Sequence, residues 1–209
     1  MTDIRLEIKL ENNKGDTEWL EIPTNSSIVD RVFNNISKDG NEEVLIKEVD
    51  QEEDFIKHLD RLNYETIFKL NNFITELNPE REDKVLAMID GYGADVDLIY
   101  IMDNYRYSID NFIIHEDITI PEDYGRYCLD EFDLSPETII YHTDLLGLGE
   151  FLLDTYDYEE VDLDPVELAE EYIESHDLDD TIKSFINLDD LGNELATNGV
   201  FTSYGYLEG

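Results

Sequence analysis

The sequence predicts an α+β fold: an elongated chain of small modules, with an N-terminal antiparallel sheet plus helix, a central helical part and a C-terminal α+β part. Strict alternation of apolar and charged residues over 4–10 is typical of a half-buried strand. Apolar residues recur at spacings of three and four through 56–90, which indicates amphipathic helices. Thirteen Tyr, nine Phe and one Trp exclude an intrinsically disordered chain, because such chains contain few aromatic residues.

The N-terminal module, residues 1–55, is predicted to contain a hairpin, a helix and a third strand. Asn13, Lys14 and Gly15 form a turn between the first strand and its hairpin partner, which Pro23 ends. A serine supplies the N-cap of the helix, because its side-chain oxygen can accept a hydrogen bond from a free backbone N–H. The predicted elements are strands at 4–10, 17–22 and 43–49 and a helix from Ser26 or Ser27 to Gly40.

The central module, residues 56–110, is predicted to be a helical hairpin or small bundle. Asn78-Pro79 interrupts its apolar pattern, and Gly91 and Gly93 end the second helix. Residues 97–118 alternate apolar and polar groups, which favours short strands or an irregular connector. The apolar positions behind this last prediction are Ile99, Ile101, Ile113 and Ile114.

The C-terminal module, residues 111–209, contains a candidate internal repeat. Residues 124–134 resemble residues 168–178, and residues 148–152 resemble residues 191–195. Offsets of 44 and then 43 residues preserve the order of helix, short linker and Leu-Gly segment. The pattern has two explanations, an internal duplication or a chance likeness between amphipathic helices. Two copies are in any case fewer than the three that a solenoid usually needs.

The charge of the chain is its most unusual property. Fifty-three Asp and Glu face 14 Lys and Arg, a net charge of −39, whereas small domains ordinarily carry a charge of magnitude about 2–8. Residues 85–209 hold 32 acids against only Arg106, Arg126 and Lys183. A halophilic surface, a surface without a specific role and a metal-storage surface are alternatives. Because self-repulsion on this scale destabilises a compact state, and because the charge is unevenly placed, we favour a basic partner.

One predicted helix concentrates the negative charge. Asp164 is its expected N-cap, Pro165 its first residue and Ser175 its end. Like charges at spacings of three and four destabilise a helix by roughly 0.2–0.5 kcal/mol per pair, so a stripe of Glu without interspersed Lys indicates a use for the charge. The predicted buried stripe is Leu168, Ala169, Tyr172 and Ile173, and the predicted outer face is Glu167, Glu170, Glu171 and Glu174.

The amount of charge matches that of a stretch of duplex DNA. Duplex DNA carries one negative charge per about 1.7 Å of axis, so 39 charges correspond to roughly 66 Å or about 20 base pairs. A DNA-mimicking surface is therefore the leading hypothesis, and no residue is expected to be catalytic. Its candidate residues are Asp130, Glu131, Asp133, Asp154, Asp157, Glu159, Glu160, Asp162, Asp164, Glu167, Glu170, Glu171, Glu174, Asp177, Asp179 and Asp180.

Motifs for enzymatic chemistry and cofactors are missing from the sequence. The single cysteine, Cys128, excludes a disulfide framework and every multi-cysteine metal site. Asp95 and Asp97 begin a segment like a calcium loop, but no Gly stands at loop position 6. The four histidines are scattered without a metal-ligand spacing. We expect no cofactor and no metal, and we expect no nucleic-acid partner because phosphates would be repelled.

Several segments, in their order along the chain, resemble the ArdA antirestriction family. Family members end with a Tyr-Ile-Glu helix, a Tyr-Ile-Asp segment, a Gly-Arg-Asp-Leu element and a Gly-x-Phe strand. An early strand that contains Trp and a central helical stretch precede these segments. The matching residues here are 168–174, 185–187, 191–195, 199–202 and Gly205-Tyr206, with 18–23 and 67–77 upstream.

The resemblance implies an elongated, three-part α+β protein that is usually a homodimer and is encoded on mobile elements. It also implies that the protein occupies the DNA-binding cleft of Type I restriction–modification enzymes in place of DNA. Asn193 and Glu194 replace the Arg-Asp of the family, which places in doubt any local salt bridge or dimer contact of that arginine. The chain is also longer than typical members, with the excess around 97–160.

Two other functions stay open at this point. One is a DNA mimic that inhibits a different basic nucleic-acid-binding protein, such as a CRISPR nuclease. The other is a metal-dependent hydrolase that uses a carboxylate cluster. We expect a cytoplasmic protein of the bacterial host without a membrane partner, because no window approaches the roughly 18 apolar residues of a membrane helix.

Overall fold

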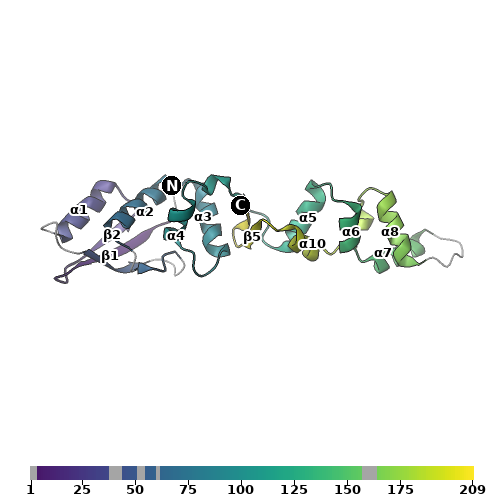
Figure 1. Ribbon diagram of the computed structural model, residues 1–209, viewed down its shortest axis with the longest axis horizontal. Helices are drawn as coiled ribbons and strands as arrows, with labels where there is room; N and C mark the ends of the chain where they lie inside the picture. The colour runs from purple at the N-terminus through teal and green to yellow at the C-terminus, as the bar shows by residue number, and fades with distance from the viewer. Residues whose placement is uncertain (1–3, 38–43, 51–54, 60–61, 157–163) are drawn as a thin grey trace. The chain divides into compact units, whose positions relative to one another are not determined.

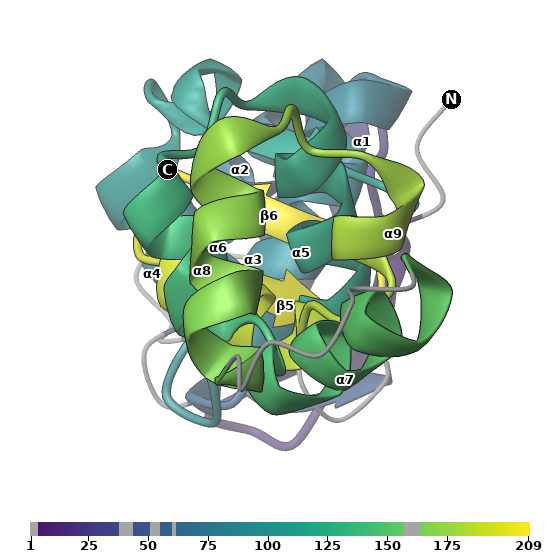
Figure 2. The ribbon, with the colours of Figure 1, turned by 90° about the vertical axis from the view of Figure 1, so that its right-hand side faces the viewer.

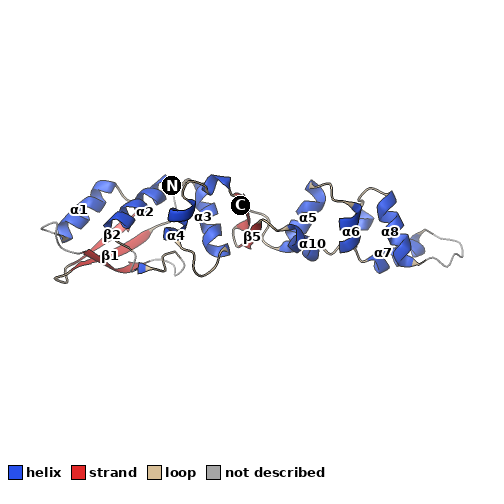
Figure 3. Ribbon diagram, in the orientation of Figure 1, coloured by secondary structure: helices blue, strands red, loops and turns tan. Residues whose placement is uncertain are grey.

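The computed structural model describes residues 4–37, 44–50, 55–59, 62–156 and 164–209. It confirms a mixed α+β fold, in which helices accompany two small sheets (Figure 3). The chain divides into two compact units (Figure 1). The first unit contains residues up to 114 together with 202–209, and the second contains residues 115–201. The division into modules at 1–55, 56–110 and 111–209 stays a prediction.

An antiparallel sheet of order β2-β1-β3 forms one part of the first unit. Its strands are β1 (Leu6–Asn12), β2 (Thr17–Ile22) and β3 (Val44–Asp50). The structure confirms the three strands that the sequence predicts in this module, although β1 begins two residues later than expected. Leu6, Ile8 and Leu10 are fully buried on one face of β1, as its period of two requires. The turn before β2 contains Gly15 with φ 86°, a conformation that glycine adopts without steric cost.

Helix α1 (Ser26–Ile36) follows the hairpin and buries Val29, Val32, Phe33 and Ile36. The predicted serine N-cap is wrong. Asn25 is the cap, and its side-chain oxygen accepts a hydrogen bond of 2.9 Å from the backbone N–H of Ser27. The helix ends at Ile36, and Gly40, the expected stop, lies outside the described residues.

Two long helices and one short one complete the main part of the first unit. They are α2 (Tyr64–Glu76), α3 (Pro79–Gly91) and α4 (Leu98–Tyr105). Asn78 caps α3 directly before Pro79, so the break between the first two helices lies where the sequence predicts it.

Helix α4 corrects the prediction of strands or an irregular connector over 97–118. Asp97 is its N-cap, and the Asp97 carboxylate accepts a hydrogen bond of 2.8 Å from the N–H of Tyr100. Ile99 and Ile101 are both buried in this helix, because flanking apolar residues complete a helical stripe with them. Ile113 and Ile114, in contrast, do form a short strand.

That short strand, β4 (Ile113–His115), belongs to a second sheet of order β4-β6-β5. A 3-10 turn, η2 (Ile109–Asn111), precedes it, and β5 (Gly199–Thr202) and β6 (Gly205–Glu208) are its other strands. The Thr202 hydroxyl donates a 2.7 Å hydrogen bond to the carbonyl of Gly205, which closes the turn between β5 and β6.

The second unit is built almost entirely from helices. They are α5 (Pro121–Glu131), α6 (Pro136–His142), α7 (Leu145–Thr155), α8 (Pro165–Ser175), α9 (Asp180–Lys183) and α10 (Leu188–Leu195). Helix α5 packs mainly against α10, and α7 packs mainly against α8. Figure 2 shows the unit from the end that carries α7 and α8. The core of the unit includes Leu129, Ile139, Leu148, Leu152, Ala169, Ile173, Ile182, Ile186 and Leu191.

Candidate acidic interaction surface

Helix α8 has the boundaries and the cap that the sequence predicts. The Asp164 carboxylate accepts a 2.9 Å hydrogen bond from the N–H of Val166, Pro165 is the first helical residue, and the helix ends at Ser175. Of the predicted buried stripe, Ala169 and Ile173 are buried, and Leu168 and Tyr172 are partly buried. The helix therefore presents its remaining positions to solvent.

The four glutamates of α8 lie along its outer side. Glu167, Glu171 and Glu174 are exposed, and Glu170 is half-buried. Within the described part of the chain, none of the four forms an ion pair with Lys or Arg. Their charges are consequently available to a partner in solution.

The remaining candidate acids gather around α8 and at the end of α5. Asp130 and Glu131 end α5, and Asp133 follows it. Asp154 lies in α7, Asp177 follows α8 and Asp180 begins α9, and all six side chains are exposed. Asp157, Glu159, Glu160 and Asp162 lie outside the described residues.

Three of the candidate acids also hold the second unit together. The Nζ of Lys183 lies 2.8 Å from an oxygen of Asp130. Asp164 caps α8. Asp179 caps α9, accepting hydrogen bonds from the N–H of Ile182 at 2.9 Å and from the hydroxyl of Tyr172 at 3.2 Å. Sequence reasoning predicted the cap formed by Asp164 but missed the internal bonds of Asp130 and Asp179.

Tyr172 stays protonated at every pH at which the protein would work. Burial, hydrogen bonding with Tyr156 and the negative charge of Asp179 together raise its pKa from the ordinary 10.0 to about 12. The hydroxyl can therefore donate to Asp179 throughout that range. This bond connects α8 with the start of α9 across the turn between them.

The bases of the strongly acidic stretch are all neutralised within the chain. Arg126 lies 3.1 Å from Glu122 and 3.3 Å from Asp123, both on α5. Lys183 pairs with Asp130, as described above. Arg106, in the first unit, lies 3.0 Å from Glu76. The acids left over determine the sign of the field around the second unit.

Glycines allow the helices of the second unit to touch backbone to backbone, and an added Cβ would approach backbone most closely at Gly149 and Gly192. A Cβ added at Gly192 of α10 would lie 1.8 Å from the carbonyl oxygen of Pro121, at the start of α5. A Cβ added at Gly149 of α7 would lie 1.9 Å from the carbonyl oxygen of Pro165, at the start of α8. No side chain fits at either contact, because real Cβ atoms stay beyond 3.0 Å.

The connections that precede α7 and α10 meet in a matched pair of hydrogen bonds. The N–H of Asp144 donates to the carbonyl of Phe185 at 2.9 Å, and the N–H of Asn187 donates to the carbonyl of His142 at 2.8 Å. Thr143 and Ile186 form the antiparallel bridge between them. Asp144 and Asn187, Thr143 and Ile186, and His142 and Phe185 are each 43 positions apart, which is the second offset of the sequence likeness. Duplication of this region stays a proposal, which these contacts support.

The two residues that depart from the family pattern lie on α10. The side-chain amide of Asn193 donates to the backbone oxygen of Asp189 at 2.9 Å. An oxygen of Glu194 lies 3.3 Å from Nε2 of the buried His142, without the geometry of a hydrogen bond. Asn193 and Glu194 thus both make contacts within the second unit.

The arrangement of the described residues also bears on metal binding and on membrane insertion. Among the described residues, no group of three or more His, Cys, Asp and Glu is arranged to hold a metal ion. Asp97, considered above as part of a calcium loop, is buried and accepts hydrogen bonds from Tyr100 and Lys57 N–H groups. In the described ranges, no helix has both the length and the apolar character needed to cross a membrane.

Comparison with protein families gives one match that covers nearly the whole chain. A family model described as Antirestriction protein (ArdA) matches residues 11–208. Comparisons with curated proteins and with solved structures gave no match.

Proposed function

Because this chain belongs to the ArdA family of antirestriction proteins, we propose that it inhibits Type I restriction–modification enzymes by occupying their DNA-binding cleft in place of DNA. The inhibitor acts by steric and electrostatic occlusion, and no residue performs chemistry. The observation that carries this proposal is the row of unpaired glutamates on α8.

The charge density of α8 supports the mimicry. Eleven residues at a rise of about 1.5 Å give a helix of roughly 16 Å. Four glutamates over this length correspond to one carboxylate per about 4 Å, close to the one phosphate per about 3.4 Å along each strand of duplex DNA. A cleft that binds the DNA backbone with Lys and Arg would therefore meet a comparable row of charges.

A competition assay tests the proposal. A labelled duplex is bound to a Type I modification methyltransferase, and the protein is titrated in while fluorescence anisotropy is measured at two salt concentrations. We expect stoichiometric displacement of the duplex that weakens steeply at the higher salt, because the cleft must exchange its counterions as it does with DNA. Absence of displacement at micromolar protein would contradict the proposal, and CRISPR nucleases would then be the next enzymes to assay.

A further inference from the structure

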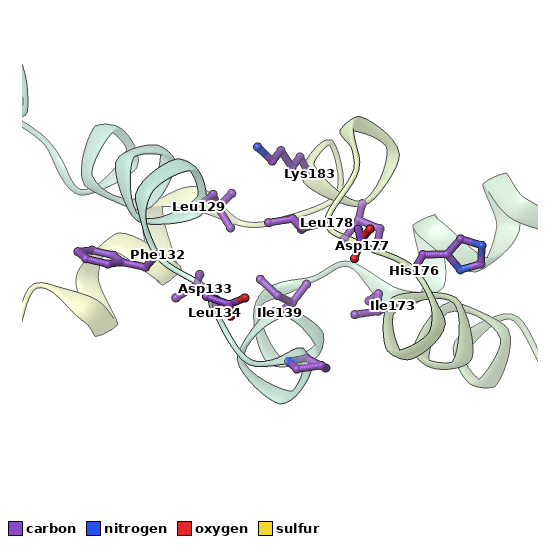
Figure 4. A pocket seen from close by; sticks show the side chains of 12 residues that line it. Leu129, Phe132, Asp133, Leu134, Ile139, Ile173, His176, Asp177, Leu178 and Lys183 are labelled. Atoms are coloured by element: carbon purple, nitrogen blue, oxygen red, sulfur yellow. The ribbon is translucent and has the colours of Figure 1, made fainter.

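A cavity of about 310 Å³ opens in the second unit, near the ends of α5 and α8 (Figure 4). Its volume is at the lower end of the roughly 300–1,000 Å³ range of ligand pockets, which favours a single side chain over a larger ligand. The residues that form its apolar wall are Leu129, Leu134, Ile139, Ile173, Leu178 and Ile182. Such a wall can hold the aliphatic part of a side chain.

Two carboxylates border the apolar wall. Asp133 and Asp177 lie on either side of Ile139 and Leu178 in Figure 4, and both are exposed. Each is the second residue after a helix, since α5 ends at Glu131 and α8 at Ser175. In the described part of the chain, neither side chain has a hydrogen-bond or ion-pair partner.

The helix ends strengthen the preference of this cavity for a cation. The C-terminus of a helix carries a partial negative charge, and here two C-termini approach the same cavity. Lys183 is the only Lys or Arg among the lining residues, and its Nζ is already 2.8 Å from Asp130. Its ammonium group points away from the apolar side chains in Figure 4. Asp133 and Asp177 leave the formal charge of the cavity negative, although the ring of His176 and the N-terminus of α6 at Pro136 also border it.

We propose that this cavity binds one arginine side chain of the protein partner. The three methylene groups of the arginine would lie on the apolar wall, and its guanidinium would meet the carboxylates of Asp133 and Asp177. Arginine suits the site better than lysine, because its planar group has five N–H donors and is less strongly hydrated. The inference rests on the proposed function for the identity of the partner, and it adds an anchoring contact to an otherwise distributed surface.

Direct binding to the cavity can be measured without the partner. Three isoleucines line it, so the full-length protein is labelled at the isoleucine δ1-methyl groups and titrated with N-acetyl-arginine methylamide. We expect saturable NMR shifts confined to Ile139, Ile173 and Ile182. N-acetyl-norleucine methylamide, which has an aliphatic side chain without charge, and the D133N/D177N variant supply the controls. Absence of shifts, or equal shifts in either control, would overturn the proposal.

Competition with DNA then tests whether the partner uses the cavity. Asp133→Asn with Asp177→Asn should weaken displacement at least about tenfold more than Glu171→Gln with Glu174→Gln, which removes the same charge from α8. Equal losses of displacement in the two variants would agree with a distributed mimic surface and would refute the cavity as an anchoring contact. If the wild-type protein displaces no DNA at all, the proposed function fails, and the methyl shifts still decide whether the cavity binds arginine.

Discussion

Single polar side chains cap the N-termini of the helices, and the aspartates among them also carry negative charge. The N-caps that accept a hydrogen bond are all Asn, Asp or Ser: Asn25, Asn63, Asn78, Asp97, Ser135, Asp144, Asp164, Asp179 and Asn187. Replacing such a cap by Ala costs about 1 kcal/mol, whereas Asn caps about as well as Asp. Neutralisation of Asp164 or Asp179 should therefore use Asn, so that loss of charge is not confused with loss of a helix cap.

An ion pair in the first unit should make stability depend on pH in a predictable direction. Arg81 binds both oxygens of Asp110, with Nε at 2.6 Å from one and Nη2 on the other. Hydrogen bonding to Arg81 lowers the pKa of Asp110 below its ordinary value of 3.8. A lowered pKa stabilises the fold above the unfolded-state value, and this stabilisation disappears as the pH falls through the folded-state value.

Asp110→Asn should accordingly lower the unfolding temperature at pH 7, and the difference from wild type should shrink as the pH falls below 3.8. Asp95→Asn is the matched control, since Asp95 is exposed and the substitution removes the same charge. Thermal unfolding followed by circular dichroism gives both values. A difference between the two variants that is independent of pH would show that the ion pair contributes nothing.

At the scale of elements, two helix pairs form the second unit. Helix α5 packs on α10 and α8 packs on α7, so each pair takes one helix from each of the two similar stretches. The bridge between Thr143 and Ile186 lies between the two stretches and joins them. Each stretch alone would leave the apolar faces of its helices uncovered, so the unit should unfold cooperatively.

The glycine contacts should decide the stability of these pairs. Gly192→Ala and Gly149→Ala should each destabilise the second unit by about 1–3 kcal/mol or more, because the added methyl group overlaps a backbone oxygen. Gly147→Ala is the comparison variant, since its Cβ would meet only the side chain of Asp144, and even full loss of this cap of α7 costs about 1 kcal/mol. Urea unfolding followed by fluorescence measures the differences. Equal stabilities of all three variants would contradict this account of the packing.

At the scale of the whole molecule, the proposed inhibition depends on negative charge that is spread over many residues. Among the described residues, no glutamate side chain of α8 has a hydrogen bond or ion pair that distinguishes it from the other three. If binding depends on the summed field, Glu171→Gln should raise the dissociation constant for the partner less than about threefold, because one exposed charge contributes little. Neutralising all four positions, Glu167, Glu170, Glu171 and Glu174, should raise it by about 30-fold or more and reduce the salt dependence.

A variant with Asp at all four positions keeps the charge and serves as the control for changes in packing. Circular dichroism would verify that the helix content is retained in both multiple variants. The distributed account would fail if Glu171→Gln alone abolished inhibition, or if the Asp variant lost as much affinity as the Gln variant.

Features that depend on neighbouring residues could be predicted from the sequence alone. Alternation located β1 and β2, and the order of Asp164, Pro165 and a helical apolar stripe located α8 with its cap. Over 98–105 the same reasoning went wrong, because a short apolar segment fits a buried helix as well as a strand. Composition gave the net charge of −39, on which the proposal of a basic partner rests.

Which separate segments of the chain meet could be seen only in the folded protein. The offset of 43 residues suggested two similar halves, but it could not show that each helix pairs with one from the other half. Nor could it show that Asp133 and Asp177 border one cavity, or that Lys183 is neutralised by Asp130. Asp133 and Asp177 are 44 positions apart, and Asp130 and Lys183 are 53 positions apart. These contacts follow from the packing of apolar faces and of Gly149 and Gly192 against backbone, which local sequence patterns do not encode.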